Sequence, residues 1–254
     1  KEYTDYREWR VPNPRVVILF VHGLGAYSVR WEAAAEFFLN KGISSYAVDL
    51  PNLTSVSSFY SEILRIRQIA IKDNPDKKIF LAGESLGGLV SFLFAAERPE
   101  LFDGLICISP AFANRKKLKF SEIISILAPL LYNPSKQVKL PFDSSMCTRD
   151  EDYRKKMNED PFEYRSSPAS LIFGIFLAQA RARFVSKSIR SSVLFLLSGD
   201  DKIVDTEVSK NIFNSLPLQD KTLREFPGMY HSLSVDTGKE AVFDELLKWI
   251  DKRI

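Results

Sequence analysis

Residues 79–93 read IFLAGESLGGLVSFL, in which one serine, Ser85, lies among three glycines between two apolar runs. The first run is typical of a buried strand and the second of a buried helix, so the serine is left on a sharp turn between them. Side chains two residues before and after such a turn would collide across it, which explains glycine at both Gly83 and Gly87. The stretch therefore predicts a strand, a strained turn that presents Ser85, and a helix.

Similar short apolar runs recur along the chain and predict a mostly parallel sheet. They are Val16–Val21, Ser45–Val48, Ile79–Ala82, Leu105–Ile108, Val193–Leu197 and Thr222–Phe226. Helical patterns alternate with them at 57–72, Leu86–Glu97 and Lys239–Ile250. Because strands and helices alternate, we predict an α/β fold whose sheet is covered by helices on both faces.

One region breaks this alternation. Residues 111–189 contain no run that reads as a buried strand, but two helical patterns, Ser121–Leu131 and Ala169–Arg183, flank a polar middle. We therefore expect an α/β core made of residues 1–110 and 190–254, with residues 111–189 inserted as a helical cap.

Composition narrows the class of protein only in part. The chain has 35 basic and 32 acidic residues, a balance that gives no reason to expect nucleic acid as a partner. Cys107 and Cys147 lie far apart and match no zinc or CxxC spacing, so free thiols in a reducing compartment, the cytoplasm, are expected rather than a disulfide. The densest apolar run, Leu171–Ala178, is too short to span a bilayer. The sequence does not decide whether a leader peptide preceded Lys1 and was removed.

A serine nucleophile needs a base, and histidine is the usual one. Of the two histidines, only His231, just after the last predicted strand, follows Ser85 in the chain. His22 ends the first predicted strand and is expected to fix a loop. We therefore predict that His231 is the base.

The acid that orients the histidine is expected after the penultimate strand, where residues 199–205 read GDDKIVD. Three aspartates compete for this role. Asp201 is favoured because Asp200 lies closer to the strand and Asp205 is placed to begin a helix as its N-cap. The alternative for this cluster is capping and a solvated loop, and without further ligands it predicts no metal site.

Acyl transfer also needs hydrogen-bond donors for the oxyanion. The usual donors are the backbone N–H that follows the nucleophile and another from an early strand-end loop, which here are those of Leu86 and Leu24. No organic cofactor is expected for this chemistry.

These motifs resemble the α/β-hydrolase superfamily and, within it, the monoacylglycerol lipase and lysophospholipase-like serine hydrolases. The motifs are VHGLG (21–25), GESLGG (83–88), RPELFDGLICISPA (98–111), CTRDEDYRKKMNEDPFEYR (147–165), DDKIVD (200–205) and GMYHSL (228–233). The resemblance implies an α/β-hydrolase fold with a cap, a Ser85–Asp201–His231 triad, oxyanion donors at Leu24 and Leu86, and hydrolysis of carboxylic esters. The sequence departs from that pattern at Glu84, where histidine is commoner, and at Asp49–Thr54, which lacks a glycine-histidine-glycine stretch.

The insertion suggests a substrate with an acyl chain. Apolar residues recur at helical spacing in both of its helices, and we expect Ile124, Leu127 and Phe176 to line an acyl pocket over Ser85. The alternative is that these residues only pack the cap onto the sheet. Transient contact of the cap with a membrane or lipid surface is a further possibility. The same machinery could instead serve a thioesterase or a peptidase, and a non-catalytic binding protein with this fold is the remaining alternative. The oligomeric state is not predicted.

Overall fold

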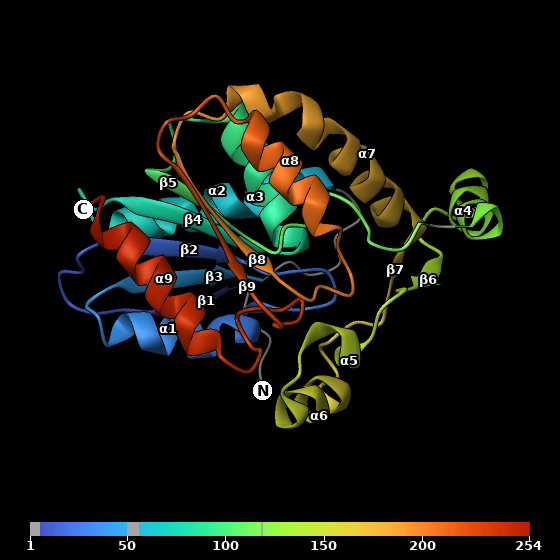
Figure 1. Ribbon diagram of the computed structural model, residues 1–254, viewed down its shortest axis with the longest axis horizontal. Helices are drawn as coiled ribbons and strands as arrows, with labels where there is room; N and C mark the ends of the chain where they lie inside the picture. Colours follow the sequence, from blue (N-terminus) through green and yellow to red (C-terminus); the bar gives the residue numbers. More distant parts are fainter. Residues whose placement is uncertain (1–5, 50–55, 118) are drawn as a thin grey trace.

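A seven-stranded sheet forms the centre of the protein (Figure 1). The computed structural model describes residues 6–49, 56–117 and 119–254. The strands, in their spatial order, are β1 (Tyr6–Trp9), β3 (Ser44–Val48), β2 (Val17–Val21), β4 (Ile79–Glu84), β5 (Gly104–Ile108), β8 (Ser192–Ser198) and β9 (Lys221–Phe226). Only the edge strand β1 is antiparallel to its neighbour. The predicted mostly parallel sheet and its six predicted strands are confirmed.

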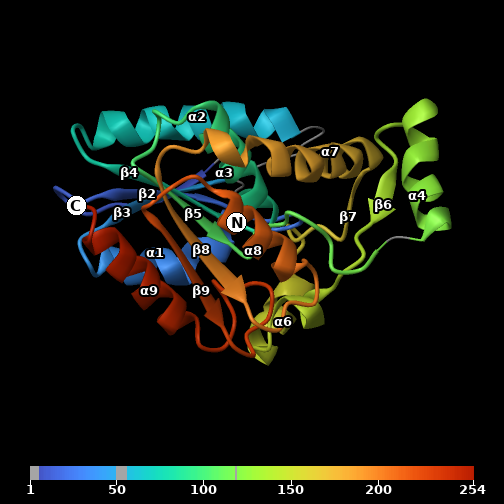
Figure 2. The same cartoon turned by 45° about the horizontal axis from the view of Figure 1, so that its top comes forward.

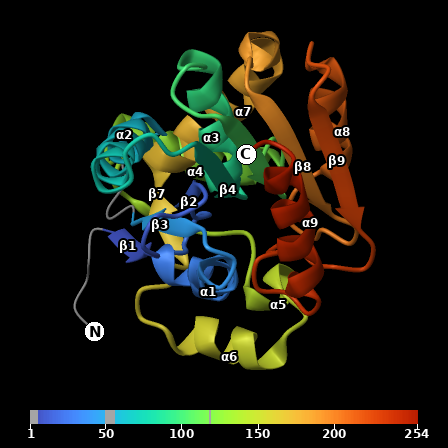
Figure 3. The same ribbon diagram turned by 90° about the vertical axis from the view of Figure 1, so that its left-hand side faces the viewer.

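Helices cover both faces of the sheet, as Figure 3 shows. One face carries α1 (Glu32–Leu39) and α9 (Lys239–Asp251), and the other carries α2 (Val56–Asp73), α3 (Leu86–Glu97), α7 (Ala169–Val185) and α8 (Thr206–Ser215). Alternate residues of each strand enter the two cores, so Ile18 and Phe20 face α1 and α9 whereas Leu19 faces α2 and α3. Each fully buried side chain of this size stabilises the fold by about 1.5–3 kcal/mol.

Between β5 and β8 the chain leaves the sheet. It runs through α4 (Phe120–Leu127), the 3₁₀ turn η2 (Ala128–Leu131), β6 (Gln137–Lys139), α5 (Ser144–Cys147), α6 (Glu151–Glu159), β7 (Ser166–Pro168), α7 and η3 (Ser186–Ser188). Figure 2 shows α4, β6 and β7 together on one side of the molecule. The predicted helix 121–131 is instead α4 followed by η2, because Pro129 has no N–H with which to continue an α-helix. The small β6–β7 sheet was not predicted.

One helical stretch of the described residues, Ala169–Ser188, is long and apolar enough by composition to span a membrane. The sequence prediction counted only the run 171–178 and did not expect this. In the structure α7 packs along α3 and buries Leu171, Ile175 and Ala178 in the core on that face of the sheet. It therefore forms part of the protein core here.

Candidate active site

The turn between β4 and α3 holds Ser85 in a strained conformation. Its φ of 57° lies in the left-handed region, which costs a residue with a side chain of order 1–3 kcal/mol. A Cβ on Gly83 would lie 2.3 Å from the Gly87 carbonyl oxygen, and a Cβ on Gly87 would lie 2.1 Å from that of Val21. Glycine is therefore required at both positions. The turn is also held in place by a hydrogen bond from the backbone N–H of Ser85 to the Ile108 carbonyl at 2.9 Å.

Three side chains from distant parts of the sequence form a continuous hydrogen-bonded line. The Ser85 hydroxyl donates to Nε2 of His231 at 2.8 Å, and Nδ1 of His231 donates to Oδ2 of Asp201 at 2.8 Å. With a carboxylate on Nδ1, the proton lies on Nδ1 and Nε2 is free to accept the serine proton. The arrangement suits nucleophilic catalysis, with Ser85 as nucleophile and His231 as base.

The three aspartates after β8 have different partners. The second oxygen of Asp201, Oδ1, accepts the backbone N–H groups of Ile203 and Val204, so the carboxylate is fixed in place and only 1% exposed. Asp200 pairs instead with the half-exposed Lys202. Asp205 accepts backbone N–H groups at the start of α8, which confirms that it is the N-cap of that helix.

The buried pair controls the charge of the histidine. Burial alone would lower the pKa of His231, but the Asp201 charge and hydrogen bond, with a smaller contribution from Glu84, raise it above its ordinary value. Burial likewise opposes ionisation of Asp201, yet His231 and the two backbone N–H groups hold its pKa below the ordinary value. The site therefore favours the imidazolium–carboxylate pair that forms when a serine is deprotonated.

Two backbone N–H groups lie beside Ser85 with no acceptor. The loop after β2 approaches so closely that a Cβ on Gly23 would be 3.1 Å from the Ser85 Cβ. Within the described ranges, no hydrogen bond uses the N–H of Leu24 or of Leu86. They are the groups predicted to receive an oxyanion.

His22 occupies this loop in a different role. Its Nδ1 donates to the Gly23 carbonyl at 2.8 Å, and burial lowers its pKa to about 4, so the ring is neutral. It fixes the loop, as its position in the sequence suggested.

An apolar pocket of about 230 Å³ opens on Ser85 between the core and the insertion. Phe176 lines it, as predicted, together with Ile175 and the two loop leucines Leu24 and Leu86. The side chain of Ile126 does so from α4. Apolar walls of this kind suit an acyl chain.

The prediction for two α4 residues needs correction. Ile124 does not line the pocket that opens on Ser85 and is 47% exposed, whereas Leu127 lines a separate neighbouring pocket of about 360 Å³ that it shares with Phe176. The apolar residues of α4 form one broad stripe, and Ile126 at its edge is the only buried side chain among those the structure describes there, so helical spacing could not show which part of the stripe points toward Ser85.

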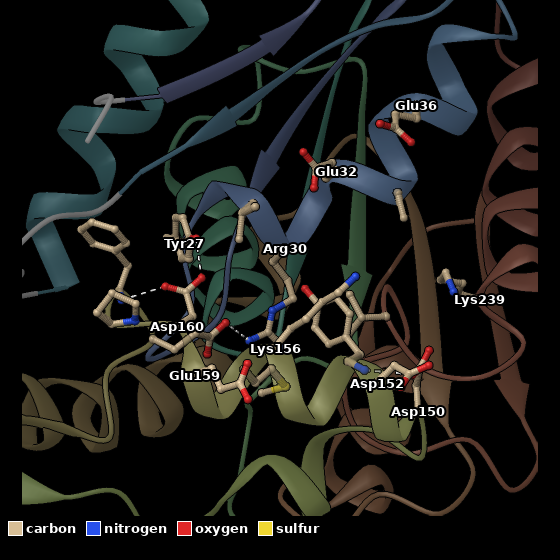
Figure 4. A pocket seen from close by; sticks show the side chains of 18 residues that line it. Tyr27, Arg30, Glu32, Glu36, Asp150, Asp152, Lys156, Glu159, Asp160 and Lys239 are labelled. Atoms are coloured by element: carbon tan, nitrogen blue, oxygen red, sulfur yellow. Dashed lines mark hydrogen bonds and ion pairs between the residues drawn. The ribbon is translucent and has the colours of Figure 1, made fainter. Parts of the chain in front are cut away.

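Charged residues lie around a second, smaller cavity at Ser85. Arg30 in the 3₁₀ turn η1 (Ser28–Trp31) and Glu163 in the loop before β7 form a buried ion pair at 2.5 Å, and the Arg30 guanidinium lies over the Tyr153 ring. This pair borders a small cavity of about 30 Å³ that reaches Ser85 and His231, and also an outer pocket of about 760 Å³. Figure 4 shows Arg30 at the centre of that outer pocket, which is rich in carboxylates.

This pair was not predicted from the sequence. Arg30 and Glu163 are separated by 133 positions, and no sequence motif around either residue predicts an ion pair between them. A charged residue in a loop is ordinarily a solvated one.

The loop that carries His231 is tied to the insertion. The fully buried Asp236 accepts the N–H of Tyr230 at 2.8 Å, the Thr148 hydroxyl at 3.1 Å, and the Arg149 N–H at 2.6 Å and Nε at 2.9 Å. The N–H of Ser232 donates to the Cys147 carbonyl at 2.8 Å. We call these contacts the Asp236 clasp. It holds α5 and the start of α6 against the histidine loop.

Two further points concern the site predictions. No group of three or more His, Cys, Asp or Glu side chains in residues 6–49, 56–117 and 119–254 could hold a metal ion. The departure from the family pattern at Asp49–Thr54 lies, apart from Asp49, outside the described residues.

The comparisons with known proteins agree with this geometry. The family described as serine aminopeptidase, S33, matches residues 12–238. The chain is 29% identical to the monoglyceride lipase of Mus musculus, over all of this chain and 88% of that protein, and 25% identical to phospholipase YtpA of Bacillus subtilis, over 97% and 99%. The crystal structure of Paleococcus ferrophilus monoacylglycerol lipase covers 98% of each chain at 27% identity, with a TM-score of 0.89.

Proposed function

Because the chain belongs to the serine aminopeptidase S33 family of α/β-hydrolases and is a carboxylic ester hydrolase, we propose that Ser85, His231 and Asp201 are its catalytic triad. Its substrates are acyl esters of small polar alcohols, of the monoacylglycerol or lysophospholipid kind. The observation that carries the proposal is the hydrogen-bonded line from Ser85 through His231 to Asp201, beside an apolar pocket and a small cavity lined by several charged side chains.

The proposed reaction has two halves. Ser85 Oγ attacks the ester carbonyl while His231 Nε2 takes its proton, and the N–H groups of Leu24 and Leu86 stabilise the oxyanion. The C–O bond to the alcohol then breaks as His231 returns the proton to the alcohol oxygen. Water, deprotonated by His231, attacks the acyl-enzyme and releases the carboxylic acid and free Ser85.

The two sides of Ser85 suggest how the substrate lies. The acyl chain occupies the apolar pocket lined by Phe176 and Ile175, and the alcohol faces the polar cavity beside Arg30. The named relatives favour the same substrates, since they are called monoglyceride lipase and phospholipase. On this assignment residues 111–189 are the cap of a core formed by residues 1–110 and 190–254.

A direct test combines covalent labelling with a substrate panel. A fluorophosphonate probe should label the protein at Ser85, and turnover should be greatest for monoacylglycerols or lysophospholipids. Matched thioesters and amino-acid anilides test the two alternative activities on the same machinery. A protein that binds the esters but is neither labelled nor active would be a binding protein.

The acyl pocket can be tested by adding bulk. In Phe176→Trp the larger ring takes up pocket volume, so long acyl chains no longer fit. We expect kcat/KM for long acyl esters to fall by about tenfold or more for each methylene group that the pocket can no longer hold, and kcat/KM for short esters to stay at the wild-type value. Ile124→Trp is the matched control, because that side chain lies outside this pocket. The measurement is kcat/KM over esters of increasing chain length, with the melting temperature. Equal losses at every length, with a lower melting temperature, would mean that Phe176 only packs the cap.

The outer surface of the insertion favours contact with a lipid surface. Ile123, Ile124 and Leu127 on α4 are 39%, 47% and 40% exposed, and Leu131 in η2 is 91% exposed. A lipid-borne substrate would bring the protein to such a surface, and these side chains would lose water on contact. We place the protein in the cytoplasm, because its two cysteines are free and buried, as expected in a reducing compartment.

We expect Leu131→Asp to reduce binding to phospholipid vesicles severalfold, because a charge replaces an apolar side chain at the proposed contact. Hydrolysis of a dissolved short-chain ester should stay at the wild-type rate. Vesicle co-sedimentation and ester turnover measure the two effects. Unchanged sedimentation of the variant would argue against lipid contact through η2.

A further inference from the structure

Glu84, the residue before the nucleophile, is a buried carboxylate for which the triad mechanism has no use. It ends β4, and only 3% of its surface is exposed. One oxygen accepts the backbone N–H of Ser234 at 3.0 Å, and the other accepts the Ser234 hydroxyl at 2.9 Å. Leaving a carboxylate buried is costly unless its oxygens are paired, and both are paired here with one residue.

Ser234 belongs to the loop that carries the base. It lies three residues after His231, and it is buried with 1% of its surface exposed. Glu84 therefore connects the strand that presents Ser85 to the loop that presents His231. A shift of this loop would lengthen the hydrogen bond from Ser85 Oγ to His231 Nε2.

In its ionised form Glu84 also acts on His231 through its charge, which favours the protonated ring. Burial raises the pKa of Glu84, while the Ser234 hydrogen bonds, Arg30 and His231 oppose that rise. Glu84 and His231 line the same small cavity. Its other charged or titratable residues are Arg30, Asp143, Cys147, Glu163 and Arg165, and Asp201 contacts His231 directly. Of these, Arg30 disfavours protonation of His231 and Asp201 favours it.

We propose that Glu84 is a positioning residue for His231: it anchors the histidine loop through Ser234, and its negative charge stabilises the imidazolium that forms when Ser85 attacks. The inference rests on the proposed function, since it assigns a role within the same triad. Asp201 and Glu84 then divide the task. Asp201 holds the ring by a hydrogen bond, and Glu84 holds the loop and adds a second negative charge.

The test is the pH dependence of kcat/KM for Glu84→Gln on a short-chain ester. Its acid limb reports the pKa of His231 in the free enzyme. Glutamine keeps the size of the side chain but removes the charge, so the imidazolium is destabilised and the acid limb should move down by roughly half a pH unit to one unit. At neutral pH, kcat/KM should fall by about tenfold, because the charge supports the transition state.

Asp49→Asn is the matched control. Asp49 is 2% exposed and accepts both the N–H and the hydroxyl of one serine, Ser28, as Glu84 does with Ser234. Loss of a buried carboxylate should lower the melting temperature in both variants, whereas only Glu84→Gln should move the acid limb. A limb that stays in place in a folded Glu84→Gln protein would overturn the proposal.

If Glu84→Gln does not fold, Ser234→Ala decides the question. It removes one anchor of the loop with little change in volume, so kcat should fall severalfold with KM unchanged. A wild-type kcat in this variant would overturn the positioning role. A wild-type protein that neither labels nor hydrolyses esters would instead contradict the proposed function, so the two failures are distinguishable.

Discussion

Ser85→Ala is expected to lower the kcat of ester hydrolysis by roughly a millionfold and to leave the melting temperature close to that of the wild type. The hydroxyl supplies the attacking oxygen, and its only side-chain hydrogen bond in the described residues is to His231 Nε2. Alanine also keeps the Cβ that the turn already accommodates at a φ of 57°. Turnover of a monoacylglycerol and thermal unfolding measure the two effects.

Covalent labelling sharpens this test. The alanine variant should not react with the fluorophosphonate probe, whereas Ser91→Ala, which removes a buried serine of α3 outside the line to His231, should still react. An acyl-enzyme that forms in Ser85→Ala would place the nucleophile elsewhere in the chain.

Asp201→Asn should lower kcat by roughly ten-thousandfold. The carboxylate uses one oxygen for His231 and the other for the N–H groups of Ile203 and Val204. An asparagine has a single oxygen, which the two backbone N–H groups would hold, so its NH₂ group would face Nδ1. The ring would then carry its proton on Nε2, where it cannot accept one from Ser85.

Asp200→Asn is the control for this result. The carboxylate of Asp200 pairs with Lys202 at the surface, where the Asp200 side chain is 41% exposed and the Lys202 side chain 39% exposed. We expect a change in kcat of less than about threefold, because exposed pairs of this kind contribute little. Steady-state kinetics at neutral pH compare the two variants, and a larger loss in Asp200→Asn would transfer the role of the acid to Asp200.

The central strands could be predicted because each is an uninterrupted apolar run, buried on both faces. The edge strand β1 could not, since Tyr6–Trp9 is only partly buried and mixes charged with aromatic residues. The helix α1 begins without a side-chain cap, which removes the usual start signal. The strands β6 and β7 are three residues each, β6 is mostly exposed and β7 reads Ser-Ser-Pro, so they leave no apolar run to detect.

For the site, the sequence was informative where chemistry demands a particular residue at a particular spacing. Ser85 with its glycines, and a histidine after the last strand, are of this kind. The choice among three aspartates depended on their order, and the structure gives its physical basis in the partners of Asp201. The partners of Arg30 and Glu84 lie far away in the sequence, so no local pattern could connect them.

The Asp236 clasp gives the insertion two mechanically different parts. The Cys147–Arg149 segment cannot separate from the histidine loop without breaking buried hydrogen bonds to Asp236 in one cooperative opening. The helix α4 packs on η2 and α7 and lies outside the clasp. A displacement of α4 would therefore leave the contacts that hold the histidine loop intact. Backbone amides of the clasp should exchange with deuterium far more slowly than those of α4.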